Sequence, residues 1–202
     1  MVPLDPLAHG DSLFELMGGR ENEALWFYLS KGPFPDRESF DKHLKQVAAS
    51  DDPLCFAAID ERSGRALGWA AFMHIEPAHR VVEVGNVVFS RALQHTTGGT
   101  EAIYLMARHA FEDLGYRRLE WKCNTLNAPS RKAAMRFGFK FEGVFRNHMI
   151  LKGRSRDSAW FSIIDSEWPE RRSAFEAWLD PSNFDSEGRQ RTSLSALNHV
   201  ET

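Results

Sequence analysis

The chain alternates between apolar and polar residues in several short runs, which is the pattern of half-buried β-strands. Three such runs follow one another with only short turns between them, at 53–60, 65–75 and 80–89. Strands joined by short turns run antiparallel, so these runs predict a meander. Three more runs come later in the chain, and a stub precedes the first helix: 117–124, 139–150, 157–164 and 2–4.

Between these runs the apolar residues recur every three or four positions, which predicts helices that pack on a sheet. Asp36 and Asn127 stand where helix N-caps are expected, and Gly115 stands where a helix would end. The apolar side of the expected helix 98–114 includes Leu114. The other expected helices cover 8–17, 22–29, the stretch from Asp36 to Asp52-Pro53, 127–138 and 166–179.

This order of elements predicts an α+β fold with a mixed, mostly antiparallel sheet of about six to seven strands and helices on both faces. We expect a parallel, right-handed crossover from the strand 80–89 to the strand 117–124. A single domain is expected over residues 1–180. Residues 181–202 are polar and poorly periodic, so we expect a loose tail there.

Composition narrows the class of protein. The chain of 202 residues has a net charge of −3, which gives no reason to expect a nucleic-acid partner. It contains no apolar run near the ~20 residues of a membrane span. Cys55 and Cys123 lie in apolar alternating runs and predict reduced core thiols of a cytoplasmic protein. The 8 histidines show no spacing typical of a metal site, so no metal is expected.

The junction at 90–100 carries the first functional signal. The strand 80–89 runs into a polar loop with Gly98 and Gly99, and the loop runs straight into a helix. Backbone N–H groups and the positive end of the helix dipole attract phosphate oxygens at such a junction. The pattern therefore predicts a nucleotide-like cofactor. An ordinary helix start capped by a threonine is the alternative.

The stretch 94–99 reads Gln-His-Thr-Thr-Gly-Gly, and an N-x-x-S motif at 127–130 is followed by an FGF segment at 137–139. These two segments resemble the cofactor loop and a second motif of the GNAT superfamily of N-acetyltransferases, and within it of the RimJ/RimL-type (ribosomal-protein-alanine acetyltransferase) branch. The resemblance extends over residues 1–170. It implies a GNAT-like acyl-CoA acyltransferase fold and transfer of an acetyl group from acetyl-CoA to a primary amine, either a protein N-terminus or a small molecule.

The resemblance implies contacts with acetyl-CoA from a strand end, the loop and a helix start. The strand end would bind the pantetheine arm, the loop would hold the pyrophosphate, and the helix start would bind a pantetheine amide. Gly85 stands near the bulge that parts two strands in the family, and Thr97 replaces the first glycine of the loop. The implied cofactor-binding residues are Val87, Val88, Phe89, Gln94, His95, Thr96, Thr97, Gly98, Gly99, Thr100, Asn127 and Ser130.

Two residues are the implied catalytic groups. Glu83, at the glutamate position of histone-type relatives, would accept the proton of the amine directly or through water. Ser130 would hydrogen-bond the departing thiolate. The alternatives are a solvent-facing glutamate and a serine that satisfies backbone donors in the first helical turn. Ala134 stands where many relatives carry a tyrosine acid, and Met149 where some RimJ/RimL-type enzymes carry a base glutamate.

Trp26 and Phe34 fall where family members build the wall of the acceptor pocket, and His148 lies beside the position of the missing glutamate. Core packing is the alternative for the two aromatic residues. Because Thr97, Ala134 and Met149 differ from the residues of the family motifs, a second class of function stays open. This is a non-catalytic acyl-CoA-binding protein or sensor of the same fold. No nucleic-acid or membrane partner is expected, and the protein would be a monomer or a homodimer. The resemblance also implies a fuller first strand than residues 2–4 provide.

Overall fold

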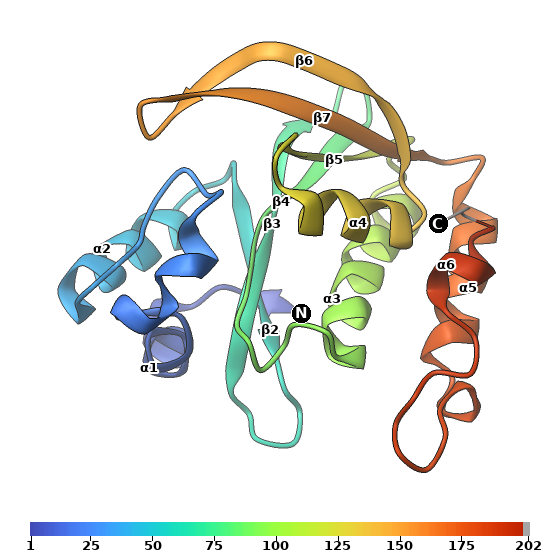
Figure 1. Ribbon diagram of the computed structural model, residues 1–202, viewed down its shortest axis with the longest axis horizontal. Helices are drawn as coiled ribbons and strands as arrows, with labels where there is room; N and C mark the ends of the chain where they lie inside the picture. The colour runs from blue at the N-terminus through green and yellow to red at the C-terminus, as the bar shows by residue number, and fades with distance from the viewer. Residues whose placement is uncertain (200–202) are drawn as a thin grey trace. The chain divides into compact units, whose positions relative to one another are not determined.

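The structure, a computed structural model, describes residues 1–199 of the chain (Figure 1). Its strands are β1 (Val2–Pro3), β2 (Leu54–Ile59), β3 (Ala66–Glu76), β4 (Val81–Phe89), β5 (Arg118–Asn124), β6 (Lys140–Leu151) and β7 (Arg154–Ile164). Within the described range they form a seven-stranded sheet in the order β1-β2-β3-β4-β5-β7-β6. The pairs β1–β2, β2–β3, β5–β7 and β6–β7 are antiparallel. The prediction of an α+β fold with a mixed, mostly antiparallel sheet is confirmed.

The helices include six α-helices and three shorter or irregular segments in the part of the chain that the structure describes. The α-helices are α1 (Pro6–Met17), α2 (Arg37–Ala48), α3 (Thr97–Arg108), α4 (Ala128–Arg136), α5 (Trp168–Leu179) and α6 (Leu194–Leu197). The others are the 3₁₀-helices η1 (Arg20–Trp26) and η3 (Pro181–Asn183) and the π-helix η2 (His109–Asp113).

The chain divides into two compact units. Unit 1 contains Met1–Ile75 and Glu83–Ala102, and unit 2 contains Glu76–Val82 and the chain from Ile103 onwards. Each unit has buried aromatic side chains of its own, as described below. The expectation of a single domain over residues 1–180 stays a prediction.

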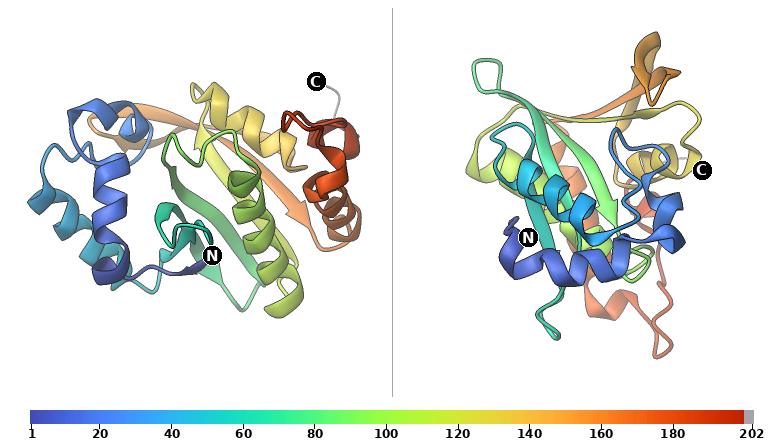
Figure 2. Two further views of the ribbon diagram at one scale, coloured as in Figure 1. Left: turned by 90° about the horizontal axis from the view of Figure 1, so that it is seen from below. Right: turned by 90° about the vertical axis from the view of Figure 1, so that its left-hand side faces the viewer.

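Unit 1 is built around an aromatic core. Trp26, Phe40 and Trp69 are fully buried, and their ring centroids lie 5.8 to 6.4 Å apart. Helices α1 and α2 lie side by side in this unit (Figure 2). Asp36 caps α2 as predicted, because its carboxylate accepts the N–H of Ser39 at 2.8 Å. Contacts between aromatic rings of this kind add to the stability that burial alone provides.

Unit 2 contains the long hairpin of β6 and β7, which runs across the top of Figure 1, and β5 pairs with the other edge of β7. Trp121 of β5, Phe137 and Phe175 of α5 form a row of rings with centroid separations of 6.0 and 6.1 Å. Asn127 caps α4 as predicted, because its Oδ1 accepts the N–H of Ser130 at 3.1 Å. The expected helix 127–138 is therefore confirmed at its start.

Two expected helices differ from the structure in type or length. The stretch expected as a helix over 22–29 is the 3₁₀-helix η1, which ends at Trp26. The helix expected over 98–114 begins at Thr97 but becomes the π-helix η2 after Arg108. The wider π turn rotates the last residues out of the apolar face, and Leu114 is 47% exposed. The prediction that Leu114 lies on the packed face of the helix is therefore wrong.

The expectation of a loose tail after residue 180 is also wrong for the residues described. Leu194 of α6 is fully buried, and Asn198 is nearly so. The Nδ2 of Asn198 donates to the carbonyl of Arg136 at the end of α4, and the guanidinium of Arg171 donates to the Asn198 carbonyl at 2.7 Å. Asn198 therefore attaches this segment to α4 and α5, and Trp178 of α5 adds a hydrogen bond to Gln190 and a ring contact with Phe184.

Replacing the buried leucine tests whether this segment contributes to the folded state. Leu194→Ala removes a fully buried side chain. We expect the free energy of unfolding, measured by urea denaturation, to fall by about 2–5 kcal/mol. The control is Leu7→Ala in α1, where the side chain is 92% exposed and the same change should have little effect. An equal, small effect of both substitutions would show that the segment after residue 180 does not pack as described.

Candidate active site

The residues predicted to act on acetyl-CoA and amine are distributed over both units. Glu83, the 87–89 strand end and the 94–100 loop lie in unit 1, and Asn127, Ser130 and His148 lie in unit 2. The structure thus groups the predicted residues into two sets.

The loop between β4 and α3 ends in a capped helix start. The hydroxyl of Thr96 accepts the N–H of Gly99 at 3.2 Å and donates to the carbonyl of Leu93 at 2.8 Å. Thr97 is the first residue of the helix, and its side chain is exposed. The threonine cap expected as an alternative is therefore present. It leaves other donors of the helix start available for a ligand.

Three backbone donors of this loop point to no protein acceptor. Among residues 1–199, no acceptor of the protein faces the N–H groups of His95, Thr97 or Gly98. Two of them are the first amides of a 12-residue helix, where the macrodipole adds a partial positive charge. A phosphate group bound there would satisfy these donors, so the loop fits the pyrophosphate that the sequence predicts.

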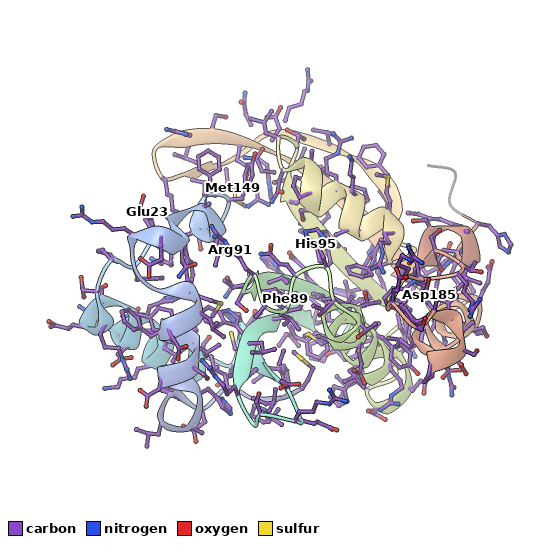
Figure 3. All side chains as sticks on the ribbon, turned by 60° about the horizontal axis from the view of Figure 1, so that its bottom comes forward. Glu23, Phe89, Arg91, His95, Met149 and Asp185 are labelled. Atoms are coloured by element: carbon purple, nitrogen blue, oxygen red, sulfur yellow. The ribbon has the colours of Figure 1, made fainter. Side chains whose placement is uncertain are left out.

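Gln94 stabilises the loop through hydrogen bonds to its backbone. Its side-chain amide donates to the carbonyl of Phe89 at 2.8 Å, and its backbone N–H donates to the carbonyl of Ser90 at 2.9 Å. The Gln94 side chain thus holds the end of β4 to the loop. Figure 3 labels Phe89 at this strand end and Arg91 and His95 on the loop, where both are exposed. The exposed guanidinium of Arg91 adds a positive charge that sequence reasoning did not consider.

Only one of the two loop glycines is required by space. A Cβ at Gly99 would lie 2.7 Å from the carbonyl oxygen of Leu93, closer than real Cβ atoms approach backbone. A Cβ at Gly98 would lie 3.4 Å from the nearest atom, a side-chain carbon of Leu93. Gly99 therefore allows the loop to fold back on itself, which fits its place as the last glycine of the predicted motif.

Glu83 is buried in the middle of the chain's fourth strand. It is 5% exposed, and its carboxylate Oε2 lies 2.7 Å from Nδ1 of His74 on β3. The alternative of a solvent-facing glutamate is therefore wrong. A Cβ at Gly85 would lie 2.9 Å from the other carboxylate oxygen, so the absence of a side chain at Gly85 leaves room for Glu83. Sequence reasoning missed His74, because nothing in the strand pattern pairs it with a residue of β4.

The backbone of β4 changes conformation just before the predicted pantetheine-binding residues. Asn86 has φ +47°, in the left-handed region. The irregular backbone lies at Asn86, the residue after Gly85, and the φ of Gly85 is not positive. A Cβ at Gly68 would lie 2.5 Å from the carbonyl oxygen of Val88, so Gly68 permits a close approach of the β3 and β4 backbones at this point.

Ser130 makes contacts beyond its place in the first turn of α4. Its Oγ accepts the indole N–H of Trp121 at 3.0 Å. Burial raises the pKa of the nearby Cys123 thiol, and a hydrogen bond from Ser130 opposes that rise. The hydroxyl hydrogen of Ser130 is therefore able to turn toward a sulfur atom. The cap on α4 occupies Oδ1 of Asn127 and leaves its Nδ2 without a protein acceptor among residues 1–199.

The aromatic residues expected at the acceptor pocket belong to the core. Trp26 is 1% exposed, and its indole N–H donates to the carbonyl of Met17 at 2.8 Å. Phe34 is also buried and stacks on His43 with ring centroids 4.7 Å apart. The structure thus favours the packing alternative, because these rings have no free face for a substrate. The pattern of apolar spacing alone did not distinguish the two roles.

His148 lies in a bulge of β6. Asn147 has φ +49°, and three residues of β6 face the single residue Asp157 of β7 between the pairs Phe145–Ser158 and Met149–Arg156. Nδ1 of His148 lies 2.9 Å from the Ser158 hydroxyl, and the imidazole is exposed. The bulge breaks the alternation of the strand, so the sequence argument that His148 and Met149 face opposite ways does not apply here.

The described residues give little support to a reactive cysteine or a metal site. Burial raises the pKa of the Cys55 thiol to about 11, which keeps it protonated, and both cysteines are free and buried. Residues 1–199 contain no group of three or more His, Cys, Asp or Glu residues arranged to hold a metal ion. None of the described helices has the length and apolar character needed to cross a membrane.

The fold and the loop geometry agree with a known family. The sequence model of the acetyltransferase (GNAT) domain matches residues 2–140, which is more than half of the chain. The chain therefore belongs to the GNAT acetyltransferase family and is an N-acetyltransferase of that family. The resemblance inferred from the loop and the N-x-x-S motif is confirmed at this level.

Relatives of known sequence or structure agree with this assignment. A crystal structure of a GCN5-related N-acetyltransferase from Brucella melitensis is 45% identical and superposes with a TM-score of 0.95, covering 98% of this chain and 90% of that one. A probable GNAT-family acetyltransferase from Chromobacterium violaceum is 42% identical, with a TM-score of 0.77 and 83% of each chain covered. An uncharacterized N-acetyltransferase, p20, of Bacillus licheniformis is 27% identical over 70% of this chain and 80% of its own length.

The two loop glycines allow a matched test of the loop geometry. Gly99→Ala places a methyl group against the Leu93 carbonyl, so we expect the free energy of unfolding to fall by about 1–3 kcal/mol in urea denaturation. Gly98→Ala makes only an ordinary contact and lies in a helix, where alanine is favoured by roughly 0.5–1 kcal/mol over glycine. The apo protein should therefore tolerate Gly98→Ala. Equal destabilisation by both substitutions would contradict the loop conformation.

Proposed function

We propose that this protein transfers the acetyl group of acetyl-CoA to a primary amine by direct attack in a ternary complex. The observation that carries the proposal is the set of unoccupied amide donors at the start of α3, in a chain of the GNAT family. These donors would bind the pyrophosphate, and Thr97 would contribute its N–H while its exposed side chain turns away. The backbone at Val87, Val88 and Phe89 would bind the pantetheine arm.

Ser130 is the group we propose to assist the leaving thiolate. The Trp121 indole donates to its oxygen, so the lone pair facing Trp121 is occupied, and the hydroxyl hydrogen would turn from the Cys123 sulfur to the sulfur of coenzyme A. A hydrogen bond from this hydroxyl would stabilise the negative charge that develops on sulfur. The free Nδ2 of Asn127 would donate to a pantetheine carbonyl. The backbone N–H of Val88 would stabilise the oxyanion of the tetrahedral intermediate.

In this proposal Glu83 takes part in removing the proton of the amine. An amine attacks only when neutral, so a group must remove its proton. Glu83 is a buried carboxylate on the strand that leads to the cofactor loop, and a carboxylate in such a place needs a polar partner or a polar cavity. Glu83 acts directly, through a bound water, or through the imidazole that it holds.

The acceptor amine is either a protein N-terminus, as the RimJ/RimL-type branch would suggest, or a small molecule. An α-amine has an ordinary pKa near ~8 and is roughly a tenth neutral at pH 7, whereas a lysine amine near ~10.4 is almost entirely charged. The α-amine therefore needs less help from the base. His148, with its exposed imidazole in the β6 bulge, is the residue of unit 2 that we propose to contact the acceptor.

A non-catalytic acyl-CoA-binding protein is the second candidate function. Ala134, at the position of the family's tyrosine acid, is fully buried in α4. Met149 offers no base in place of the branch's glutamate. A protein with the cofactor loop but without either group would bind acyl-CoA and transfer nothing.

Incubation with acetyl-CoA and a panel of amines separates the two candidates. The panel contains peptides with free N-termini, polyamines and amino acids, and free thiol is measured. We expect thiol release with at least one amine, together with thermal stabilisation by coenzyme A. Stabilisation without release on any amine would favour the binding protein. The absence of both would remove both candidates.

Glu83→Gln tests the place of the proton acceptor. The amide keeps the size of the side chain and removes its basicity, so turnover should fall by roughly 10²–10⁴-fold while the Kd for coenzyme A, measured by calorimetry, changes little. The control is Glu61→Gln in the exposed turn between β2 and β3, which should behave as the wild type. Unchanged turnover in Glu83→Gln would reject this assignment.

A further inference from the structure

His74 and Glu83 form a pair in which one member is buried and the other is open to solvent. The His74 side chain is 62% exposed and the Glu83 side chain only 6%. Nδ1 of His74 lies 2.7 Å from Oε2 of Glu83, which is a short, charge-assisted hydrogen bond. A carboxylate at Nδ1 favours the tautomer with hydrogen on Nδ1, in which Nε2 is the basic nitrogen of the ring.

The backbone of β3 is shaped to place the imidazole beside Glu83. In a regular strand Met73 and His74 would face opposite sides. A Cβ at Gly85 would lie 2.8 Å from the Met73 sulfur and 2.9 Å from a Glu83 oxygen, so Met73 and Glu83 share a face. His74 reaches Glu83 on that same face because its φ of +47° interrupts the alternation.

Asp52 holds this irregular backbone in place. One oxygen of its carboxylate accepts the N–H of His74 at 3.0 Å, and the other accepts the N–H of Ile75 at 3.1 Å. Left-handed backbone at a non-glycine residue is unfavourable and persists only where surrounding contacts enforce it. A carboxylate that binds two successive amides is such a contact. Asp52 and Glu83, from separate parts of unit 1, thus fix the position of the His74 imidazole.

We propose that His74 is the catalytic base and that Glu83 is the residue that positions it. The inference rests on the proposed function and identifies which atom receives the proton. The nitrogen of the amine forms a bond to the thioester carbon, the carbon–sulfur bond breaks, and coenzyme A leaves as the thiolate. The proton of the amine moves to Nε2 of His74, and the imidazolium, held by the Glu83 carboxylate, releases it to water.

The difference in exposure decides between the two groups. A base must come within hydrogen-bond reach of the proton that it removes. The Glu83 carboxylate is enclosed and already bonded through Oε2, whereas most of the His74 side chain is open to a substrate or to water.

Substitution of His74 with chemical rescue tests this role. His74→Gly suits the left-handed backbone and leaves space for a free imidazole, and His74→Asn keeps a side chain that tolerates the same φ. We expect both variants to lose turnover by roughly 10²–10⁴-fold with the Kd for coenzyme A unchanged. Added imidazole should restore turnover at least tenfold in His74→Gly and not in Glu83→Gln. His79→Ala, in the exposed turn after β3, is the control.

The outcomes distinguish this inference from the proposed function. If the wild type releases thiol and the His74 variants release it at the same rate, the role of His74 is overturned and the transferase stands. Loss of turnover in both variants without rescue by imidazole also overturns it, because a purely structural role would give that result. If the wild type transfers no acetyl group to any amine, the proposed function and the role of His74 fail together.

An observation independent of turnover checks the pair itself. Nitrogen-15 NMR of the histidine rings should find hydrogen on Nδ1 of His74 in the wild type near neutral pH. In Glu83→Gln this preference should weaken, since a neutral amide holds the imidazole less strongly than a carboxylate does. A wild-type ring with its hydrogen mainly on Nε2 would overturn the proposal.

Discussion

The burial of one carboxylate is the constraint on which the centre of unit 1 depends. Glu83 stands among buried valines on β4, where an unpaired charge would be strongly unfavourable. Three other residues make the burial of this carboxylate possible. His74 supplies a hydrogen-bond partner, Gly85 supplies the space, and Asp52 fixes the backbone that carries His74. The burial of Glu83 thus gives a physical reason for the residue type at each of these three positions.

Much of the fold could be predicted from the chain itself. Strands of period two and helices of period 3.6 were found close to their observed bounds, and the caps at Asp36 and Asn127 were correct. The misses come from places where tertiary contacts override local pattern. The π-helix after Arg108 rotates Leu114 into solvent, and Leu194 attaches a polar segment whose composition predicts no packing.

The candidate site was less predictable, for a related reason. The loop was identified because a strand, glycines and a helix in this order have few other uses, yet the side chain of Gln94 turned out to bind the protein's own backbone. The family resemblance implies a pocket role for Trp26 that its burial does not support. His74 could not be predicted, because in a regular strand it would face away from Met73 and therefore away from Glu83. No pattern in the sequence indicates that a histidine takes a left-handed backbone conformation.

Three non-glycine residues with left-handed backbone lie within strands beside the residues that carry the proposals. His74 is one, Asn86 precedes the predicted pantetheine-binding residues, and Asn147 precedes His148. Each interrupts the regular alternation that would otherwise give every side chain a fixed face. A sheet built only for stability gains nothing from such residues, because they disturb its pairing. In the proposed mechanism these are the places where a backbone group or an imidazole must turn out of the regular pattern, and so the irregular backbone supports the proposed chemistry.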